Sequence, residues 1–191
     1  MPQHKLHIRN MVCPRCIKVV TEELERLKLP VLDVKLGEVV LGREPSAVEL
    51  SEVRDALAAN GFELLEDRKA ETVERVKVLI IDLIRSGKVE GLQVNISDYL
   101  AEATGRDYGY LSSLFSGEEG TTIARYVVLQ KVERAKELME YNELNLSQIA
   151  YQLGYSSVAH LSNQFKQVTG VSPSDYKKSA DQHRRPLDQV L

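Results

Sequence analysis

The spacing of hydrophobic residues changes near residue 67 and divides the chain into two parts. Before that point, strand-like segments over 5–11, 31–36, 39–41 and 62–67 are interrupted by helical spacing over 16–29 and 46–61. Leu32 is expected in the alternating buried set, and Val48 on the same helix face as Val53 and Leu57. The order strand, helix, strand, strand, helix, strand predicts a ferredoxin-like βαββαβ domain over 1–67.

After residue 67 only helical spacing is found. Val73, Val76, Ile80 and Leu83 line one face of a first helix, and a long helix is predicted over 122–141. We therefore predict an all-α domain over 68–178, followed by a flexible tail over 179–191. The fold class is α+β with two domains.

The all-α part contains an internal repeat. Each copy has a first helix with a small residue, a turn glycine, a second helix with Leu and Phe four residues apart, and a later glycine and tyrosine. The paired positions are Ala101 and Ala150, Gly105 and Gly154, Leu111/Phe115 and Leu161/Phe165, Gly120 and Gly170, and Tyr126 and Tyr176. This pattern predicts two helix-turn-helix units in tandem.

The second copy carries a specific motif. The run "IA..LGY.S...LS..FK...G.SP..YK" within 149–178 resembles the DNA-binding domain of AraC-type transcription regulators, and the resemblance extends over 72–178. It implies a sequence-specific protein whose two recognition helices enter adjacent segments of the major groove of double-stranded DNA.

The chemistry of the predicted recognition helices agrees with this resemblance. Opposite the core residues, amides and imidazole can hydrogen-bond base edges, alanine can meet a thymine methyl, and hydroxyls and lysine suit phosphates. The candidate DNA-binding residues are Gly109, Tyr110, Ser112 and Ser113 in the first unit, and Ser156, Ser157, Val158, Ala159, His160, Asn163 and Lys166 in the second.

Charge limits the electrostatic part of this binding. The formal net charge is -3, and residues 121–178 hold seven Lys or Arg against five Asp or Glu. Neither predicted groove face carries an arginine, the commonest base reader. We therefore expect formation of a homodimer, or readout of DNA shape, to add to a modest phosphate attraction.

Both cysteines of the chain lie in "MVCPRC", residues 11–16, after the first predicted strand. They could form a metal site, a redox pair or two ordinary small side chains. In this topology, Met-x-Cys-x-x-Cys resembles the heavy-metal-associated domains of copper chaperones and metal-pumping ATPases, over residues 5–67. The resemblance implies thiolate ligands at Cys13 and Cys16, with Met11 beneath the loop and Phe62 packed near it.

The residues themselves favour a soft ion. Two thiolates at a helix N-terminus, beside Arg15 and Lys18, should have a lowered pKa, and they suit Cu(I) best, or Zn(II) if other ligands join. Asn10 stands where the resembling family usually has glycine. The "CPRC" run also allows a thioredoxin-like redox role, which remains the alternative for this site.

Other function classes find little support in the sequence. No apolar run is long enough for a membrane span, and the polar N-terminus lacks a signal core, so a cytoplasmic protein is expected. No catalytic constellation is visible, so we do not expect an enzyme. The prediction is a DNA-binding transcription regulator that responds to a soft metal. The alternative is a metal carrier or thiol-redox sensor whose helical domain binds protein.

Overall fold

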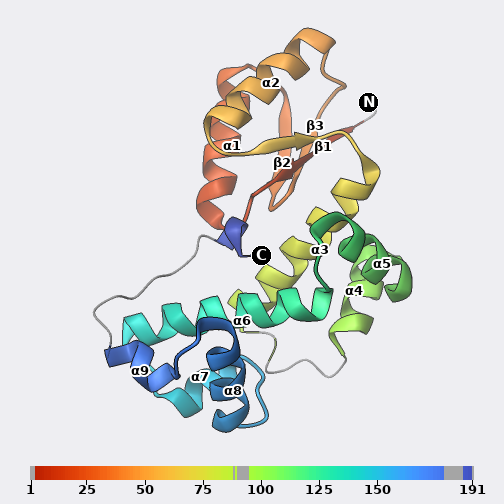
Figure 1. Ribbon diagram of the computed structural model, residues 1–191. Helices are drawn as coiled ribbons and strands as arrows, with labels where there is room; N and C mark the ends of the chain where they lie inside the picture. The colour runs from red at the N-terminus through yellow and green to blue at the C-terminus, as the bar shows by residue number, and fades with distance from the viewer. Residues whose placement is uncertain (1–2, 88, 90–94, 179–186, 191) are drawn as a thin grey trace. The chain divides into compact units, whose positions relative to one another are not determined.

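The computed structural model describes residues 3–87, 89, 95–178 and 187–190 (Figure 1). The chain forms two compact units, residues 1–78 and 79–191. The division falls inside helix α3 (Arg68–Arg85), so the two ends of this helix belong to different units. None of the helices in the described residues combines the length and the apolar character that a membrane span requires.

The N-terminal unit is built around a small antiparallel sheet. Its elements are β1 (His4–Arg9), α1 (Pro14–Arg26), β2 (Val31–Lys35), β3 (Glu38–Leu41), α2 (Ala47–Ala59) and β4 (Glu63–Leu65). The strand order in the sheet is β2-β3-β1-β4, and each pair of neighbours is antiparallel. Strands and helices follow one another in the predicted order.

Residues at the helix starts explain where α1 and α2 begin. Pro14 occupies the first turn of α1, where its missing N–H would have had no partner within the helix. Before α2, the Ser46 hydroxyl accepts a hydrogen bond from the Glu49 N–H at 3.3 Å, and the Glu49 carboxylate accepts one from the Ser46 N–H at 2.8 Å. This capping box fixes the start of α2.

Alternation along β1 gives the sheet two different faces. Leu6 and Ile8 are buried on the face that α1 and α2 cover, in a core with Val20, Leu24, Val53 and Leu57. His7 points to the other face, where its Nε2 lies 3.8 Å from the Glu71 carboxylate at the start of α3. The first part of α3 therefore covers the second face of the sheet within this unit.

Two predictions about burial in this unit are wrong. The side chain of Leu32 is 57% exposed, because the pairing of β2 with β3 shifts register between Val31 and Asp33 and leaves Leu32 at the irregularity. Val48 is 69% exposed. Five residues before Val53, it lies about 140° around the helix from that buried position at about 100° per residue.

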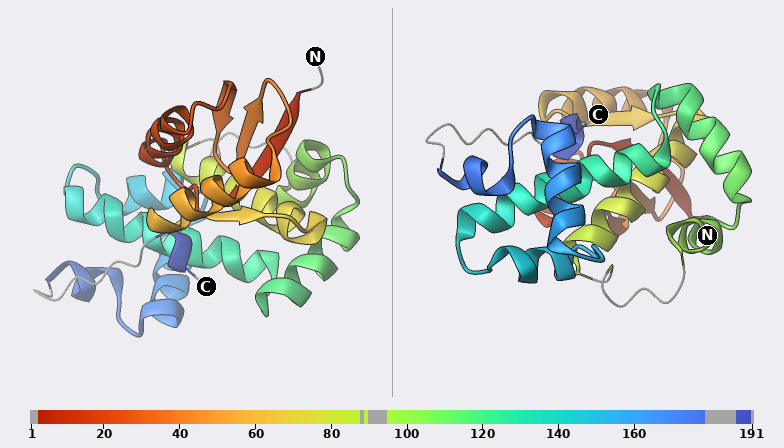
Figure 2. Two further views of the ribbon diagram at one scale, coloured as in Figure 1. Left: turned by 90° about the horizontal axis from the view of Figure 1, so that it is seen from above. Right: turned by 60° about the horizontal axis from the view of Figure 1, so that its bottom comes forward.

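The C-terminal unit is helical. Its elements after α3 are α4 (Ile96–Thr104), α5 (Tyr108–Glu119), α6 (Ile123–Tyr141), α7 (Leu146–Gln152), α8 (Val158–Thr169), α9 (Pro173–Lys178) and the 3-10 helix η1 (Leu187–Gln189). Helices α4 and α5 lie toward one end of α6, and α7, α8 and α9 toward the other (Figures 1 and 2). Most of the predicted tail, residues 179–186 and 191, lies outside the described residues.

The two helix-turn-helix units match closely in their cores. Each recognition helix, α5 or α8, ends at a left-handed glycine, Gly120 or Gly170. The Phe115 and Tyr126 rings lie 5.5 Å apart between centroids, and the Phe165 and Tyr176 rings lie 5.4 Å apart. Both pairs are offset by 50 residues, so residues 106–126 and 156–176 correspond position by position.

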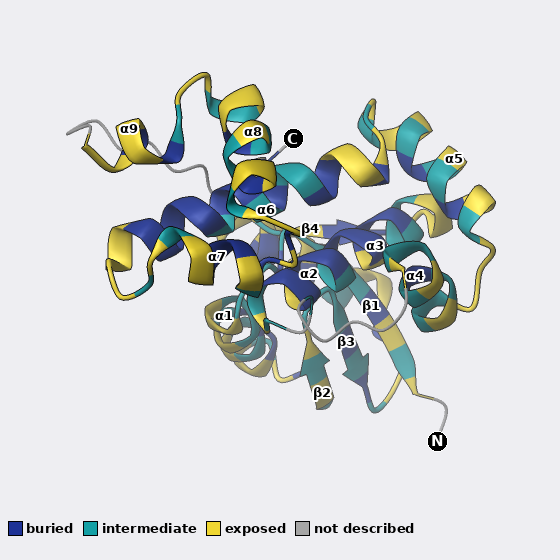
Figure 3. Cartoon of the chain, turned by 90° about the horizontal axis from the view of Figure 1, so that it is seen from below, coloured by how far each residue is buried: buried dark blue, intermediate teal, exposed yellow. Residues whose placement is uncertain are grey.

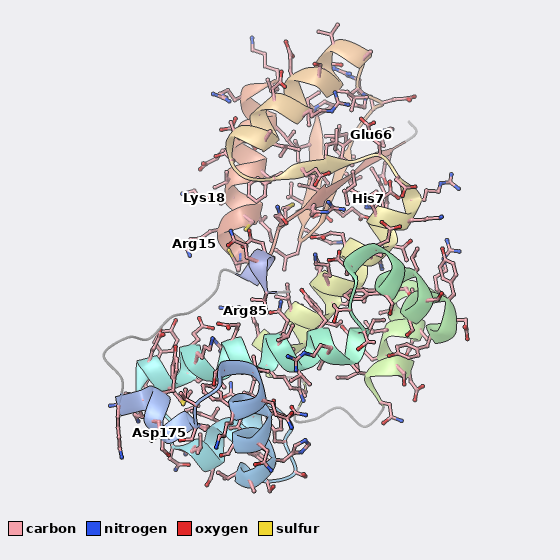
Figure 4. The ribbon with its side chains drawn as sticks, in the orientation of Figure 1. His7, Arg15, Lys18, Glu66, Arg85 and Asp175 are labelled. Carbon is pink, nitrogen blue, oxygen red and sulfur yellow. The ribbon has the colours of Figure 1, made fainter. Side chains whose placement is uncertain are left out.

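Helix α6 buries charged side chains that are paired within the unit. The Lys136 ammonium lies 2.6 Å from the Glu133 carboxylate, and both residues are buried. Glu137, only 5% exposed, receives Arg134 of its own helix at 2.6 Å and Arg85 of α3 at 3.1 Å. The side chain of Arg85 is labelled in Figure 4. These pairs compensate the charges of Glu133, Lys136 and Glu137 where α6 is buried.

Glu137 is held as a carboxylate. Burial alone would raise the pKa of its carboxyl, but hydrogen bonds from Arg134 and Arg85 outweigh burial and lower that pKa below its ordinary value. The folded state therefore binds fewer protons here than the unfolded state. The contribution to stability is complete above the ordinary carboxyl pKa and is lost as the pH falls through the lower, folded pKa.

We expect Glu137→Gln to lower the free energy of unfolding by about 1–3 kcal/mol, because two arginines lose their carboxylate partner. Urea unfolding, followed by circular dichroism, would measure the change. The variant should also lose stability less steeply than the wild type as the pH falls below about 5. Glu143→Gln, at an exposed position after α6, is the matched control, and equal losses in the two variants would contradict the assignment.

Candidate nucleic-acid interface and thiol pair

Helix α8 presents a polar face to solvent. Its N-cap residue Ser157 accepts a hydrogen bond from the His160 N–H at 3.1 Å, and Leu161 and Phe165 are completely buried. The opposite face is exposed, as the yellow parts of α8 in Figure 3 show. Of the predicted residues in this unit, Val158 is half-buried and the exposed ones are Ser156, Ser157, Ala159, His160, Asn163 and Lys166.

The start of α8 is ordered by side chains. The Ser156 hydroxyl lies 3.3 Å from His160 Nδ1, and the His160 ring meets the buried Tyr155 ring edge-on at 5.2 Å. Beneath them, the Lys131 ammonium lies 5.0 Å from the centre of the Tyr155 ring. Burial lowers the pKa of that ammonium. His160 therefore has a structural contact in addition to its exposed edge, whereas Asn163 has none that the described structure shows.

Helix α5 has fewer exposed candidate DNA-binding residues than α8. Its N-cap residue Asp107 accepts a hydrogen bond from the Tyr110 N–H at 3.1 Å. Gly109, Tyr110 and Ser113 are exposed, as predicted residues of an interface must be, but Ser112 is half-buried. A Cβ on Gly109 would lie 2.9 Å from Asp107 Oδ1, so the cap favours glycine at this position.

The structure also brings Arg106 to this surface, and the sequence interpretation missed it. The centre of the Arg106 guanidinium lies 5.8 Å from the centre of the Tyr110 ring, and both side chains are exposed. Arg106 precedes the N-cap and so lies outside the helix whose face was considered. The signal that could have found it is the spacing of four residues between an arginine and a tyrosine.

Cys13 and Cys16 lie at the start of α1. Cys13 is the N-cap residue, Cys16 lies one turn later, and their sulfurs are 3.4 Å apart. Both are half-buried free thiols. At a typical metal–sulfur distance of about 2.3 Å, one ion can contact both sulfurs. No group of three or more His, Cys, Asp or Glu suited to a metal occurs in the described residues, so the thiols would be two ligands only.

The two thiols differ in acidity. At Cys13 burial raises the pKa, but hydrogen bonds from the Cys16 N–H and thiol, with those of Arg15, lower it overall. At Cys16 burial raises the pKa, and the neighbouring Cys13 sulfur raises it further. The predicted lowering therefore applies to Cys13 and is wrong for Cys16. Arg15 and Lys18 project from the outer side of α1 (Figure 4).

The loop before the thiols is fixed from three sides. Asn10 adopts a left-handed conformation with φ of 73°, which explains why glycine would also suit this position. Its N–H donates to the Glu74 carboxylate of α3 at 3.0 Å, and its side-chain amide donates to the Gly61 carbonyl at 3.0 Å. Met11 is completely buried, and Phe62 packs partly against the same core.

Comparisons with known proteins concern the C-terminal part of the chain. A family model described as a helix-turn-helix domain matches residues 100–179. The transcriptional activator RhrA of Rhizobium meliloti (strain 1021) is 37% identical over 68 residues, 35% of this chain and 22% of RhrA. The probable transcriptional regulator LumQ of Photobacterium leiognathi is 26% identical over 132 residues, 67% of this chain and 50% of LumQ. The chain thus spans half or less of these relatives' lengths.

A solved structure extends the comparison to the fold. The C-terminal domain of AraT, a response regulator from Geobacillus stearothermophilus, superimposes with a TM-score of 0.50 at 27% identity. The match covers 61% of this chain and 97% of that domain. Together with the tandem units described above, these similarities show that the C-terminal region contains a helix-turn-helix domain similar to the C-terminal domain of AraT.

The difference between the thiols predicts their order of reaction. At neutral pH a lower pKa gives a larger thiolate fraction, so iodoacetamide should modify Cys13 faster than Cys16. Limited alkylation of the reduced protein, followed by peptide mass spectrometry, would measure both rates. Faster labelling of Cys16, or equal labelling of the two, would contradict the assigned asymmetry.

Proposed function

We propose that this protein is a sequence-specific DNA-binding transcription regulator. The observation that carries the proposal is the exposed polar face of α8, on a capped helix whose opposite face is locked into the core by Leu161 and Phe165. This is how a helix-turn-helix unit offers side chains to the major groove. The similarity to RhrA, a transcriptional activator, and to LumQ, a probable transcriptional regulator, supports the same role.

The residues on α8 divide by chemistry. Asn163 can pair with adenine through its amide, and Ala159 can contact a thymine methyl. Lys166, exposed near the end of the helix, suits a phosphate. Helix α6, with 19 residues, is about 29 Å long at about 1.5 Å per residue, close to the roughly 34 Å of one DNA turn. The two units can therefore place their recognition helices in two successive segments of the major groove.

For the N-terminal unit we propose a ferredoxin-like fold of the heavy-metal-associated kind. The support is its element order, the strand order β2-β3-β1-β4 and the position of the thiols between β1 and α1. We propose that Cys13 and Cys16 bind one soft ion, Cu(I) in preference to Zn(II), and that binding changes DNA affinity. Two thiolates alone satisfy the low coordination of Cu(I) better than the tetrahedral preference of Zn(II).

The separation of 3.4 Å between the sulfurs also supports a second candidate, a thiol-redox sensor, because a small movement would allow a disulfide. A pair that oxidises reversibly and changes DNA binding without metal would favour this candidate. Metal binding without any effect on DNA would indicate a carrier.

Asn163→Ala should weaken binding to a duplex selected from a random library by about 1–3 kcal/mol, because one bidentate base contact is lost. Fluorescence anisotropy at fixed salt would measure the affinity, and thermal unfolding should be unchanged because Asn163 is exposed. His160→Ala should weaken binding as well, with some loss of stability from the broken contact with Tyr155. Unchanged affinity in both variants would refute the groove assignment.

The thiol proposal is tested by the double variant Cys13→Ser, Cys16→Ser. An anaerobic titration of the reduced full chain with Cu(I), read by native mass spectrometry, should show one ion per chain in the wild type and none in the variant. DNA affinity should change with Cu(I) in the wild type alone. If the wild type binds no stoichiometric metal, the metal proposal fails, while DNA binding can stand.

A further inference from the structure

The two helix-turn-helix units place a side-chain pair at the same point. In the second unit, the residue before the N-cap and the third helical residue interact, since Ser156 Oγ lies 3.3 Å from His160 Nδ1. The offset of 50 residues makes Arg106 and Tyr110 their equivalents. These two interact as well, through the guanidinium 5.8 Å from the ring centre. Both units therefore order the same exposed site at the entry of the recognition helix.

The segment that forms each recognition helix and its entry contains one cation, and the two cations lie at opposite ends. Residues 156–169 contain Lys166 as their only Lys or Arg, and residues 106–119 contain Arg106 as theirs. At the position equivalent to Lys166, the first unit has the half-buried Ser116. The first unit therefore lacks the phosphate contact assigned to Lys166, and its cation lies where the second unit has Ser156.

A cation at the recognition helix matters more for DNA binding in the first unit, because that segment carries more acidic groups. Residues 106–119 contain three acidic groups, Asp107, Glu118 and Glu119, whereas residues 156–169 contain none. Asp107 stands at the N-cap, the end of a recognition helix that approaches DNA most closely. Its carboxylate would repel phosphates there, and the adjacent Arg106 is the group that can offset the repulsion.

We propose that Arg106 is the phosphate contact of the first helix-turn-helix unit and that Tyr110 holds it in position. The inference depends on the proposed DNA-binding function and adds a residue to it. Stacking on an aromatic face restrains the long arginine side chain and leaves the N–H donors at its edge accessible. A planar guanidinium held at the helix entry then matches a phosphate with little further loss of side-chain entropy.

The test measures binding of the full chain to a mixed-sequence DNA duplex across a series of salt concentrations. Arg106→Ala should weaken binding several-fold and flatten the slope of log affinity against log salt by about one unit, as Lys166→Ala should. Arg54→Ala, at an exposed arginine of the N-terminal unit, makes the same change in net charge and should leave the slope unchanged.

Variants at Tyr110 test its positioning role. Tyr110→Phe keeps the ring that restrains Arg106 and should keep the salt slope of the wild type, while Tyr110→Leu should lose part of the contribution of Arg106 to that slope. The double variant Arg106→Ala, Tyr110→Leu should bind no more weakly than Arg106→Ala alone, because tyrosine acts through arginine. Additive losses would show that Tyr110 makes its own contact and would overturn this part of the inference.

The possible results distinguish a failure of the Arg106 assignment from a failure of the proposed DNA-binding function. If Lys166→Ala flattens the salt slope and Arg106→Ala does not, DNA binding stands and the Arg106 assignment is wrong. If Arg106→Ala reduces preference for the selected duplex with no change in slope, Arg106 reads a base and the phosphate assignment is overturned. If the wild type shows no salt-dependent binding, the DNA-binding proposal itself fails.

Discussion

Helix α6 can serve two helix-turn-helix units only if it is buried along most of its length, and a long buried helix must satisfy any charge that it carries. The chain meets this constraint with short-range pairs, Lys136 with Glu133 and Glu137 with Arg134. Arg85 adds a partner from α3, so the same carboxylate ties two elements of the unit together. The cores of both units pack against this one helix through Tyr126 and through contacts of α7 and α8.

The constraint explains why the exposed faces can differ while the cores agree. Phe115 with Tyr126 and Phe165 with Tyr176 repeat with nearly the same ring separation. Outside the core, residues 106–119 contain three acidic groups and the corresponding residues 156–169 contain none. Packing sets the shared geometry, and the solvent-facing positions are then free to differ between the two units.

Much of this architecture could be predicted from the sequence because it depends on local signals. The four-residue spacing of Leu and Phe, the cap residues and the turn glycines placed the helices of the C-terminal unit, and alternation placed the strands of the N-terminal one. Val48 and Leu32 were misplaced because a helix angle and a strand irregularity decided their burial. Arg106 was missed because its contact with Tyr110 lies outside the pattern that defines the helix face.

The thiol site shows the same limit. The sequence predicted its position at the start of a helix. The opposite shifts of the two thiol pKa values, however, depend on which N–H groups reach each sulfur. Likewise, the left-handed Asn10 and its hydrogen bond to Glu74 join residues 64 positions apart. Such contacts follow from tertiary packing, which the order of residues alone does not specify.

The most direct test of tandem DNA recognition is a hydroxyl-radical footprint of the full chain on a duplex obtained by selection from random sequence. We predict two protected backbone segments on one face of the DNA, about 10 base pairs apart, one for each unit. A single protected segment would mean that one unit does not reach the DNA. The absence of any protected segment at a concentration that saturates binding would contradict recognition by this domain.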